Sequence, residues 1–306
     1  MTIQALDLGA TLYMPCTRGD LARRLFGPGR ISGLRSAVLC LEDAVLERDL
    51  PLALANLAAL LRTLAAREHD PAALPLLFVR PRDAAMLDRV LHMPGSEVLT
   101  GFVLPKATAD TLPGYLCALP ADRNLLMPTL ETREAFDGHE MRRLRDQLLS
   151  VQDRVLVLRI GGNDLMHVLG LRRAPGRTAY DGPLGPLIAT LVATFAPWGF
   201  ALSAPVMERF GDLPLLREEV ARDIEHGLIT KTAVHPDQIP IIHTALAVTP
   251  GDAEEAQRVL DPSGPAVFAR DGVMCEPATH RLWAERLLAR AALFGIAEPL
   301  PLSRRA

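Results

Sequence analysis

Two acidic residues each follow an apolar segment with the composition of a buried strand. Residues 125–130 (Leu-Leu-Met-Pro-Thr-Leu) run into Glu131, and residues 155–160 run into two glycines that are followed by Asp164. Buried parallel strands appear in sequence as short apolar runs. When such strands form a barrel, the side chains at their carboxyl ends converge on one face. The two carboxylates therefore predict a metal site at the mouth of a barrel.

Glu131 and Asp164 are about one strand–helix unit apart, so adjacent strands can present both to one ion. Two carboxylates that leave the other positions to water and substrate oxygens suit Mg²⁺, with Mn²⁺ as the alternative ion. A purely structural interpretation stays open: Glu131 as an acid in a first helical turn and Asp164 as a helix N-cap.

The elements that would position these acids are short apolar strand candidates that alternate with helical patterns. The clearest helix is 49–67, where alanine and leucine recur with a period of 3.6. Eight strand–helix units in one series favour an α/β fold of the (β/α)8 TIM-barrel class over an open doubly wound sheet. The strand candidates are 11–14, 36–41, 75–79, 99–104, 125–130, 155–160, 198–203 and 228–234.

The barrel is expected to occupy residues 1–248, and residues 249–306 form a C-terminal helical extension. The pattern over 279–294 is an amphipathic helix that includes Leu282 and Leu287, so it needs an apolar surface to cover. We expect this extension to pack on a neighbouring subunit in a homo-oligomer, or else to fold back over its own barrel.

Composition and charge restrict the function. The formal net charge of −3 leaves no basic excess to neutralise nucleic-acid phosphates, so no nucleic-acid partner is expected. Neither a signal peptide nor a membrane-spanning run is apparent. The four cysteines are far apart, which predicts reduced thiols in a cytoplasmic protein and no cysteine nucleophile. They are Cys16, Cys40, Cys117 and Cys275.

Six short motifs occur in order along most of the chain, and together they resemble the HpcH/HpaI aldolase and citrate lyase β-subunit family. Residues 271–277 also resemble the glycine–methionine–acid–proline motif of the citrate-lyase-like branch, which places Glu276 at its acid. The six are Leu41-Glu42-Asp43-Ala44-Val45, Val79-Arg80, Leu104-Pro105-Lys106, Glu131-Thr132, Gly161-Gly162-Asn163-Asp164-Leu165 and His235-Pro236-Asp237-Gln238-Ile239.

The resemblance implies a Mg²⁺-dependent carbon–carbon lyase (EC 4.1 class). Such an enzyme cleaves or condenses a β-hydroxy acid, or its coenzyme A thioester, through a metal-stabilised enolate. Its partners would be a small oxo or hydroxy acid or an acyl-CoA, with CoA as part of the substrate and not as a bound cofactor. The same resemblance implies a homo-oligomer, either a trimer or a hexamer.

The resemblance also implies a role for each matching residue. Glu131 and Asp164 would be the metal ligands, and Arg80 would hold a substrate carboxylate or an enolate oxygen, with a surface salt bridge as its alternative. Glu42 and Asp43 would be catalytic acids near the metal waters, with a solvated pair of loop residues as the alternative, and Glu276 would reach a neighbour's site. The remaining substrate-binding candidates are Lys106, Gly161, Gly162 and Asn163, although the two glycines also fit a simple tight turn. His235 is interpreted as a packing residue.

The chain departs from the family pattern at positions that would surround the substrate. Cys40 replaces an acid before the Leu-Glu-Asp motif, Arg82 replaces an asparagine after Arg80, and Ser203 replaces an acid at the seventh strand end. The first strand has Thr11-Leu12-Tyr13 where an Arg-Ser pair is usual. These changes indicate a divergent member with a different substrate. Two other interpretations remain: a non-catalytic barrel that binds an organic acid or metal within a larger assembly, and a malyl-CoA-type thioesterase or synthase.

Overall fold

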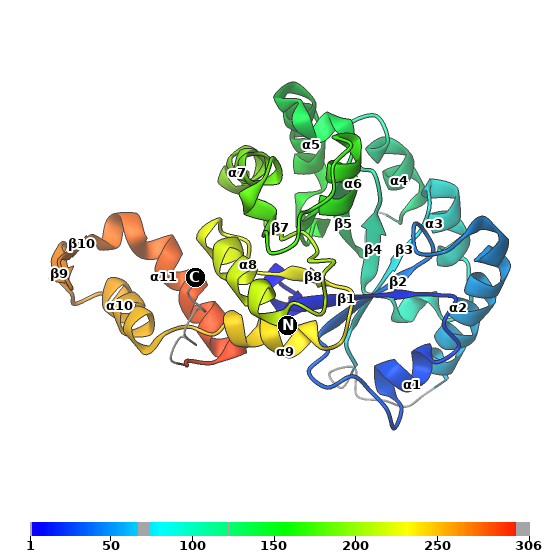
Figure 1. Ribbon diagram of the computed structural model, residues 1–306, viewed down its shortest axis with the longest axis horizontal. Helices are drawn as coiled ribbons and strands as arrows, with labels where there is room; N and C mark the ends of the chain where they lie inside the picture. The colour runs from blue at the N-terminus through cyan, green and yellow to red at the C-terminus, as the bar shows by residue number, and fades with distance from the viewer. Residues whose placement is uncertain (1, 67–73, 121–122, 298–306) are drawn as a thin grey trace.

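A closed ring of parallel strands forms the centre of the molecule (Figure 1). The computed structural model describes residues 2–66, 74–120 and 123–297. The strands pair in the order β7-β6-β5-β4-β3-β2-β1-β8, which confirms the predicted (β/α)8 barrel. They are β1 (Ala10–Pro15), β2 (Ser36–Cys40), β3 (Leu76–Arg80), β4 (Gly101–Leu104), β5 (Leu125–Leu130), β6 (Leu158–Ile160), β7 (Leu202–Ser203) and β8 (Lys231–Ala233).

Helices follow the strands and cover the outside of the ring (Figure 1). The longest of them, α2, has a buried leucine face because its leucines recur at helical spacing. The helices are α1 (Leu21–Phe26), α2 (Leu50–Ala65), α3 (Ala84–Leu91), α4 (Leu112–Ala118), α5 (Gly138–Leu148), α6 (Gly162–Val168), α7 (Leu184–Phe195), α8 (Leu213–Glu225) and α9 (Gln238–Ala245). Within the described residues, no helix has the length and apolar character needed to cross a membrane.

The ring closes between β7 and β8 through a single backbone bridge, Ala204 with Lys231. The amide of Ala204 donates to the carbonyl of Thr230 at 2.8 Å. On the outer side, the buried Lys231 ammonium lies 2.9 Å from Glu219 and 2.8 Å from Asp223, both on α8. This buried ion cluster attaches β8 to α8 where the backbone ladder is shortest.

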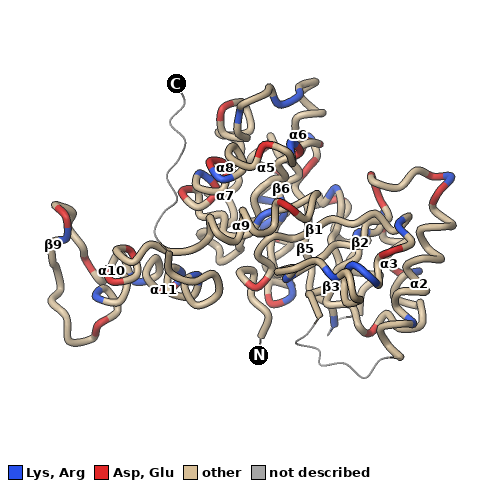
Figure 2. Tube along the Cα trace, turned by 60° about the horizontal axis from the view of Figure 1, so that its bottom comes forward, with Lys and Arg blue, Asp and Glu red and all other residues tan. Residues whose placement is uncertain are grey.

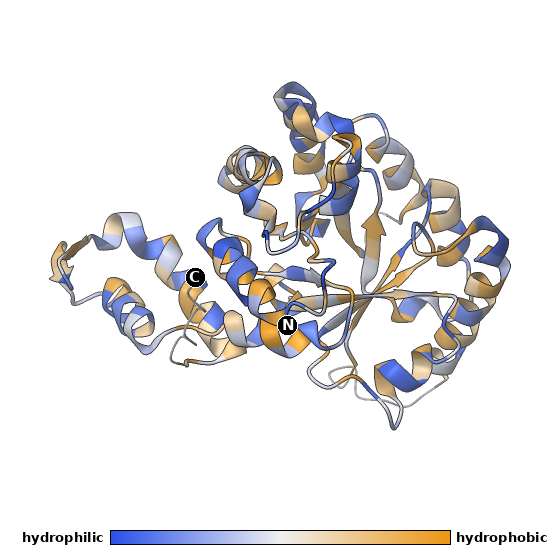
Figure 3. Ribbon diagram, in the orientation of Figure 1, coloured by the Kyte–Doolittle hydropathy of each residue, from blue (hydrophilic) through white to orange (hydrophobic). Residues whose placement is uncertain are grey.

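The barrel interior is filled at its lower level by apolar side chains. Val38, Phe78, Val103, Met127 and Val157 are fully buried in one cluster, and the strands are correspondingly hydrophobic in Figure 3. Side chains two residues apart on a strand face the same way. The next inward level therefore holds positions 40, 80, 129 and 159, and the level above it holds position 131.

Residues 250–297, called here the C-terminal arm, extend to one side of the barrel (Figure 1). The arm consists of α10 (Pro250–Leu260), an antiparallel pair β9 (Phe268–Arg270) and β10 (Val273–Cys275), and α11 (Pro277–Phe294). It has its own small core, which includes Val259, Phe268 and Leu287. The end of α11 returns to the barrel, where the Phe294 ring lies 5.3 Å from that of His243.

The strand predictions hold in number and order but differ in length. The sixth strand begins at Leu158 and not at Val155, which contributes only an isolated bridge to Leu126. The seventh begins at Leu202, because residues 196–198 form a 3-10 turn that ends at Gly199 with a φ of 87°. The predicted helix 49–67 is α2, although Arg67 lies outside the described residues. In the extension, the predicted helix 279–294 corresponds to α11, whereas α10 and the β9–β10 pair were not predicted.

Candidate active site

A cavity of about 440 Å³ opens at the carboxyl ends of the strands. Acidic and basic positions lie close together among β1, β5 and β6 in Figure 2. Because the strands are parallel, their carboxyl ends all deliver side chains to this one mouth. The residues that line the cavity are Tyr13, Cys40, Asp43, Ala44, Arg80, Thr129, Glu131, Arg159, Ile160, Gly161, Gly162, Asn163, Asp164, Val206, Thr232 and Val234.

Arg80, the last residue of β3, lies at the centre of three carboxylates. Its Nη2 atom is 2.8 Å from Glu42, 3.1 Å from Asp43 and 3.0 Å from Glu131. Arg80 is 8% exposed, so the alternative of a surface salt bridge is wrong. A planar cation in this setting orients the acids around it and presents its remaining donors to a ligand.

Glu131 follows β5 directly and is 3% exposed. Its Oε1 atom accepts a hydrogen bond of 2.8 Å from the backbone amide of Lys106. Burial and the nearby charge of Asp164 raise the pKa of Glu131 to about 7, although Arg80 opposes this shift. A second cation beside this carboxylate would stabilise its ionised form.

Gly161 is needed for the close packing of this acid. A Cβ atom at position 161 would lie 2.4 Å from Cβ and 2.6 Å from Oε2 of Glu131. Any larger side chain would therefore displace the carboxylate from the mouth of the barrel.

Asp164 stands in the first turn of α6, and Gly161 occupies the N-cap position. The pKa of Asp164 is raised by burial and by the negative charge of Asp43. Glu131 precedes the 3-10 helix that begins at Arg133, so it is not in a first helical turn. The structural alternatives, an N-cap for Asp164 and a first-turn acid for Glu131, are therefore both wrong in detail.

The donor set fits Mg²⁺. Asp164 lies near enough to Glu131 for its negative charge to raise the pKa of Glu131. Mg²⁺ usually keeps several waters and binds one or two carboxylates, so these two protein ligands are enough. Within residues 2–66, 74–120 and 123–297, no three His, Cys, Asp or Glu side chains are grouped to hold an ion. A metal here would thus depend on water and substrate oxygens for its other ligands.

Lys106 stands at the rim beside Glu42 and Asp43. Its ammonium pairs with Glu42 and lies 3.4 Å from Asp43. Its backbone has a φ of 51°, a left-handed conformation that L residues rarely adopt. That conformation lets its amide point at Glu131, so one residue holds acids from two strands. Strain of this kind is typical of functional sites.

The structure brings nearly all the predicted residues to one mouth. Gly161, Gly162 and Asn163 line the cavity. Glu276 does not: it stands at the N-cap position of α11 in the C-terminal arm and is not among the residues that line the cavity of its own chain. His235 packs its ring against Phe210 at 4.9 Å, as interpreted from the sequence.

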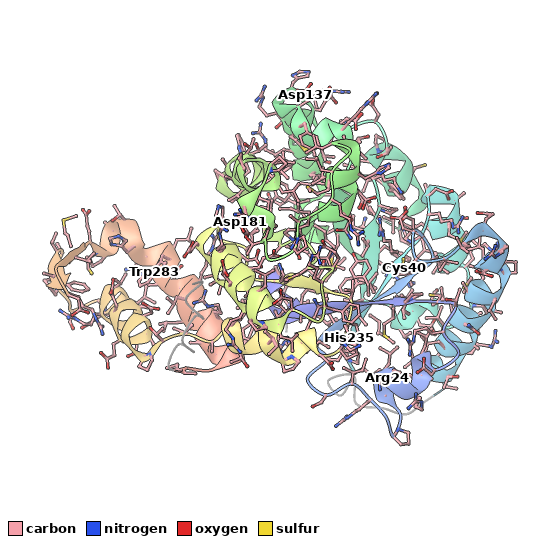
Figure 4. The ribbon with its side chains drawn as sticks, in the orientation of Figure 1. Arg24, Cys40, Asp137, Asp181, His235 and Trp283 are labelled. Carbon is pink, nitrogen blue, oxygen red and sulfur yellow. The ribbon has the colours of Figure 1, made fainter. Side chains whose placement is uncertain are left out.

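The departures from the family pattern fall in different places. Cys40, labelled in Figure 4, is 1% exposed and lines the cavity. Arg82 donates hydrogen bonds to the carbonyls of Leu41 (2.9 Å) and Val45 (2.6 Å), so it holds the loop that carries Glu42 and Asp43. Ser203 is fully buried and donates to the carbonyl of Thr230 at 3.3 Å, outside the cavity.

Arg159 is a cavity residue that the sequence predictions missed. It belongs to β6, is 2% exposed, and donates a 2.5 Å hydrogen bond to the hydroxyl of Thr232. A signal was present, because Arg159 is the only charged residue in the apolar run 155–160. It also shares its strand face with Gly161, two residues further on.

A family described as carbon–carbon bond lyases of the TIM-barrel fold matches residues 2–296. A curated (3S)-malyl-CoA thioesterase of Cereibacter sphaeroides is 30% identical over 149 residues, which are 47% of this chain and 50% of that protein. The chain thus matches about half the length of its curated relatives.

Solved structures share the fold. CitE from Mycobacterium tuberculosis, in complex with magnesium, acetoacetate and coenzyme A, has a TM-score of 0.68 at 24% identity, covering 93% of this chain and 98% of that one. RipC from Yersinia pestis has a TM-score of 0.61 at 20% identity, with coverages of 81% and 99%. The resemblance inferred from the six motifs is confirmed, and the chain belongs to the family of carbon–carbon bond lyases with a TIM-barrel fold.

Proposed function

We propose that this protein is a Mg²⁺-dependent lyase that cleaves or forms the carbon–carbon bond of a small β-hydroxy acid or its CoA thioester. The observation that carries the proposal is the meeting of Glu131 and Asp164 beside Arg80 in one cavity. Family membership supports the reaction class.

The residues divide the chemistry among them. Glu131 and Asp164 hold the ion, with Mn²⁺ as the alternative, and the bound ion supplies Lewis-acid stabilisation of negative charge. Arg80 offers its free donors to the enolate oxygen or carboxylate of the substrate, which is a preorganised electrostatic contribution. Lys106 keeps Glu42 and Asp43 at the rim, and the backbone of Gly161, Gly162 and Asn163 contacts the substrate.

Asp43 is the acceptor that we assign to the hydroxyl proton. For Asp43, desolvation is outweighed by contacts with Glu42, Arg80 and Lys106, so its pKa is lowered and the group stays ionised. In the cleavage direction the proton passes to Asp43, directly or through a water. The hydroxyl carbon becomes a carbonyl carbon, and the electrons of the broken carbon–carbon bond form the enolate of the other fragment. Arg80 donates to the oxygen of this enolate.

The substrate is proposed to be a 2-oxo or hydroxy acid, or an acyl-CoA. CitE is described in complex with coenzyme A, and the partial relative from Cereibacter sphaeroides is a malyl-CoA thioesterase. The latter supports thioester hydrolysis as a second candidate. A malyl-CoA-type synthase uses the same enolate in the condensing direction.

The C-terminal arm is proposed to bring Glu276 to the cavity of a neighbouring subunit in a cytoplasmic trimer or hexamer. In its own chain the arm leaves apolar side chains uncovered. Val273 is 60%, Met274 61% and Leu282 57% exposed. Trp283, labelled in Figure 4, follows Leu282 on α11. Partners outside this assembly are not required by the proposal.

A substrate panel separates the candidates. The purified protein with Mg²⁺ is given malyl-CoA, citramalyl-CoA and the free hydroxy acids, and both carbonyl products and free thiol are measured. A lyase yields a carbonyl acid and an intact shorter thioester, whereas a thioesterase yields thiol without carbonyl acid. The matched control is Glu131→Gln with Asp164→Asn. If the acids bind without any turnover, the non-catalytic barrel is the correct interpretation.

A further inference from the structure

Arg159 is a buried cation with no acidic partner among the described residues. Its contacts are the Thr232 hydroxyl at 2.5 Å, the Met127 sulfur at 3.7 Å and the face of the Tyr13 ring at 5.3 Å. All three partners are uncharged. Burying a guanidinium without a counter-charge is unfavourable, so this arrangement is not explained by stability of the fold.

Arg80 provides the contrast within the same cavity. Three carboxylates surround it, so its charge is compensated by the protein itself. Arg159 has a similar burial but lacks this compensation. An incoming anion would therefore gain more from Arg159 than from Arg80.

Among the described residues, three of the buried side-chain atoms without a hydrogen-bond partner lie on the same surface, and the others lie elsewhere in the molecule. Nε of Arg159, Oγ1 of Thr129 and Nε of Arg80 have no hydrogen-bond partner, and all three residues line the cavity. Thr129 and Arg159 are direct neighbours in the β5–β6 pairing. Buried polar groups normally have partners, so this cluster indicates that a ligand supplies them.

The level of Arg159 in the barrel sets the size of that ligand. Thr129 and Arg159 share one inward level, and Glu131 stands two residues further along β5. Two residues of a strand span about 7 Å. A molecule of three or four carbons can thus touch the Glu131–Asp164 pair at one end and Arg159 at the other.

We infer that Arg159 binds a second anionic group, carboxylate or phosphate, at the inner end of the substrate. The substrate class is then a short dianionic 2-oxo or hydroxy acid, or the equivalent acyl portion of a thioester. This inference rests on the proposed function, which places the outer end of the substrate at Glu131 and Asp164. Arg159 then determines which group is accepted at the inner end of the substrate.

Three matched probes share the 2-oxo acid group and differ only in the distal substituent. They are 2-oxobutyrate with a methyl group, oxaloacetate with a carboxylate, and phosphonopyruvate with a phosphonate. Binding to the full chain with Mg²⁺ is followed by calorimetry. We expect one of the dianionic probes to bind the wild type about tenfold or more tightly than 2-oxobutyrate, because a charge-assisted buried contact has that strength. The preferred probe identifies the anion.

Arg159→Met removes the charge and keeps much of the side-chain volume. We expect it to bind 2-oxobutyrate normally while the preference for the dianion disappears, and Arg159→Lys to restore part of that preference. Without ligand, Arg159→Met should melt at or above the wild-type temperature. A structural role predicts the opposite: a lower melting temperature and an unchanged preference. Arg143→Met, on the exposed face of α5, is the control for net charge.

A metal-free arm separates this inference from the proposed function. Malonate and inorganic phosphate are titrated into wild type and Arg159→Met, with thermal stabilisation as the readout. Stabilisation in the wild type alone supports the Arg159 site even if 2-oxobutyrate does not bind and the lyase assignment fails. If 2-oxobutyrate binds but the wild type shows neither a dianion preference nor stabilisation by these anions, the Arg159 inference is overturned and the lyase proposal is unaffected.

Discussion

The Nη2 atom of Arg80 lies 3.0 and 3.2 Å from the two carboxylate oxygens of Glu131. The acid comes from the end of β5 and the cation from the end of β3, and both are buried. This pair therefore links two strands that are separated by β4, and it fixes the acid that we propose as a metal ligand. The electrostatics of the cavity depend on it.

Arg80→Met should lower the free energy of unfolding by about 3–5 kcal/mol at pH 7, because Glu131 would stay buried without its cation, while Glu42 would keep only Lys106. Urea unfolding provides the measurement. The loss should be smaller at pH 5, where protonation removes part of the uncompensated charge. Arg133→Met, at a side chain that is 85% exposed, is the control and should change stability by less than about 0.5 kcal/mol. Equal losses for both variants would contradict the central role of Arg80.

Glu131 gives the metal-free protein a defined pH dependence. Its pKa in the folded state is about 7 and its ordinary value is 4.5. A raised pKa contributes stability that is fully present below pH 4.5 and is lost as the pH rises through 7. Relative to Glu131→Gln, the wild type should thus lose on the order of 3 kcal/mol between these limits. Chemical unfolding across pH 4–8 tests this.

Glu134→Gln is the matched control, because the hydroxyl of Thr132 lowers the pKa of Glu134 by a hydrogen bond. The difference between that variant and the wild type should be nearly flat between pH 4.5 and 7, because Glu134 is ionised in both the folded and the unfolded state over most of this range. A flat difference for Glu131→Gln as well would show that the Glu131 carboxyl is ionised throughout this range.

Mg²⁺ should stabilise the wild type, and Glu131→Gln with Asp164→Asn should abolish this effect. A ligand that binds only the folded state adds about 2.7 kcal/mol at a hundred times its Kd. Because the ligands must be deprotonated, the affinity should fall as the pH drops below 7. Thermal melting in a Mg²⁺ titration measures both effects.

Glu97→Gln with Asp146→Asn is the control, because it removes the same charge from two exposed positions and should respond to Mg²⁺ as the wild type does. An unchanged titration in Glu131→Gln with Asp164→Asn would falsify the metal assignment.

The sequence was sufficient to predict the barrel and most of its mouth. Strand ends are recognisable because an apolar run stops at a polar residue, as at Glu131, and the parallel arrangement then brings such ends together. Arg159 could not be assigned in this way, because its charge interrupts a strand and its importance depends on partners from β1, β5 and β8. Strands β9 and β10 have three residues each, too few for a periodic pattern. The start of α10 did have a signal, since Thr249 caps it and Pro250 follows.

The C-terminal arm should be required for assembly. Met274→Asp with Leu282→Asp places charges on side chains that are 61% and 57% exposed, so it should leave the fold of the subunit intact and shift light scattering toward the monomer. Leu52→Asp on α2, at a leucine that is 54% exposed, is the control on the barrel itself and should leave the oligomer unchanged. A wild-type protein that is monomeric at working concentration would contradict the proposal.

Complementation tests the shared cavity directly. Glu276→Gln protomers mixed with Glu131→Gln protomers should regain part of the activity, because some cavities in a mixed oligomer contain both acids. No recovery, in an oligomer that is shown to exchange subunits, would place Glu276 outside the reaction.

The single bridge between Ala204 and Lys231 has a kinetic consequence for the barrel. Every other pair of neighbouring strands shares at least two register positions, so local opening costs least between β7 and β8. Amide hydrogens near Ala204 should therefore exchange with solvent sooner than those of β1–β3. Because Lys231 is fastened to α8 by buried ion pairs, the opening would proceed by movement of β7 away from a fixed β8. The inner end of the cavity, beside Thr232, would then gain a second path to water besides the open mouth of the barrel.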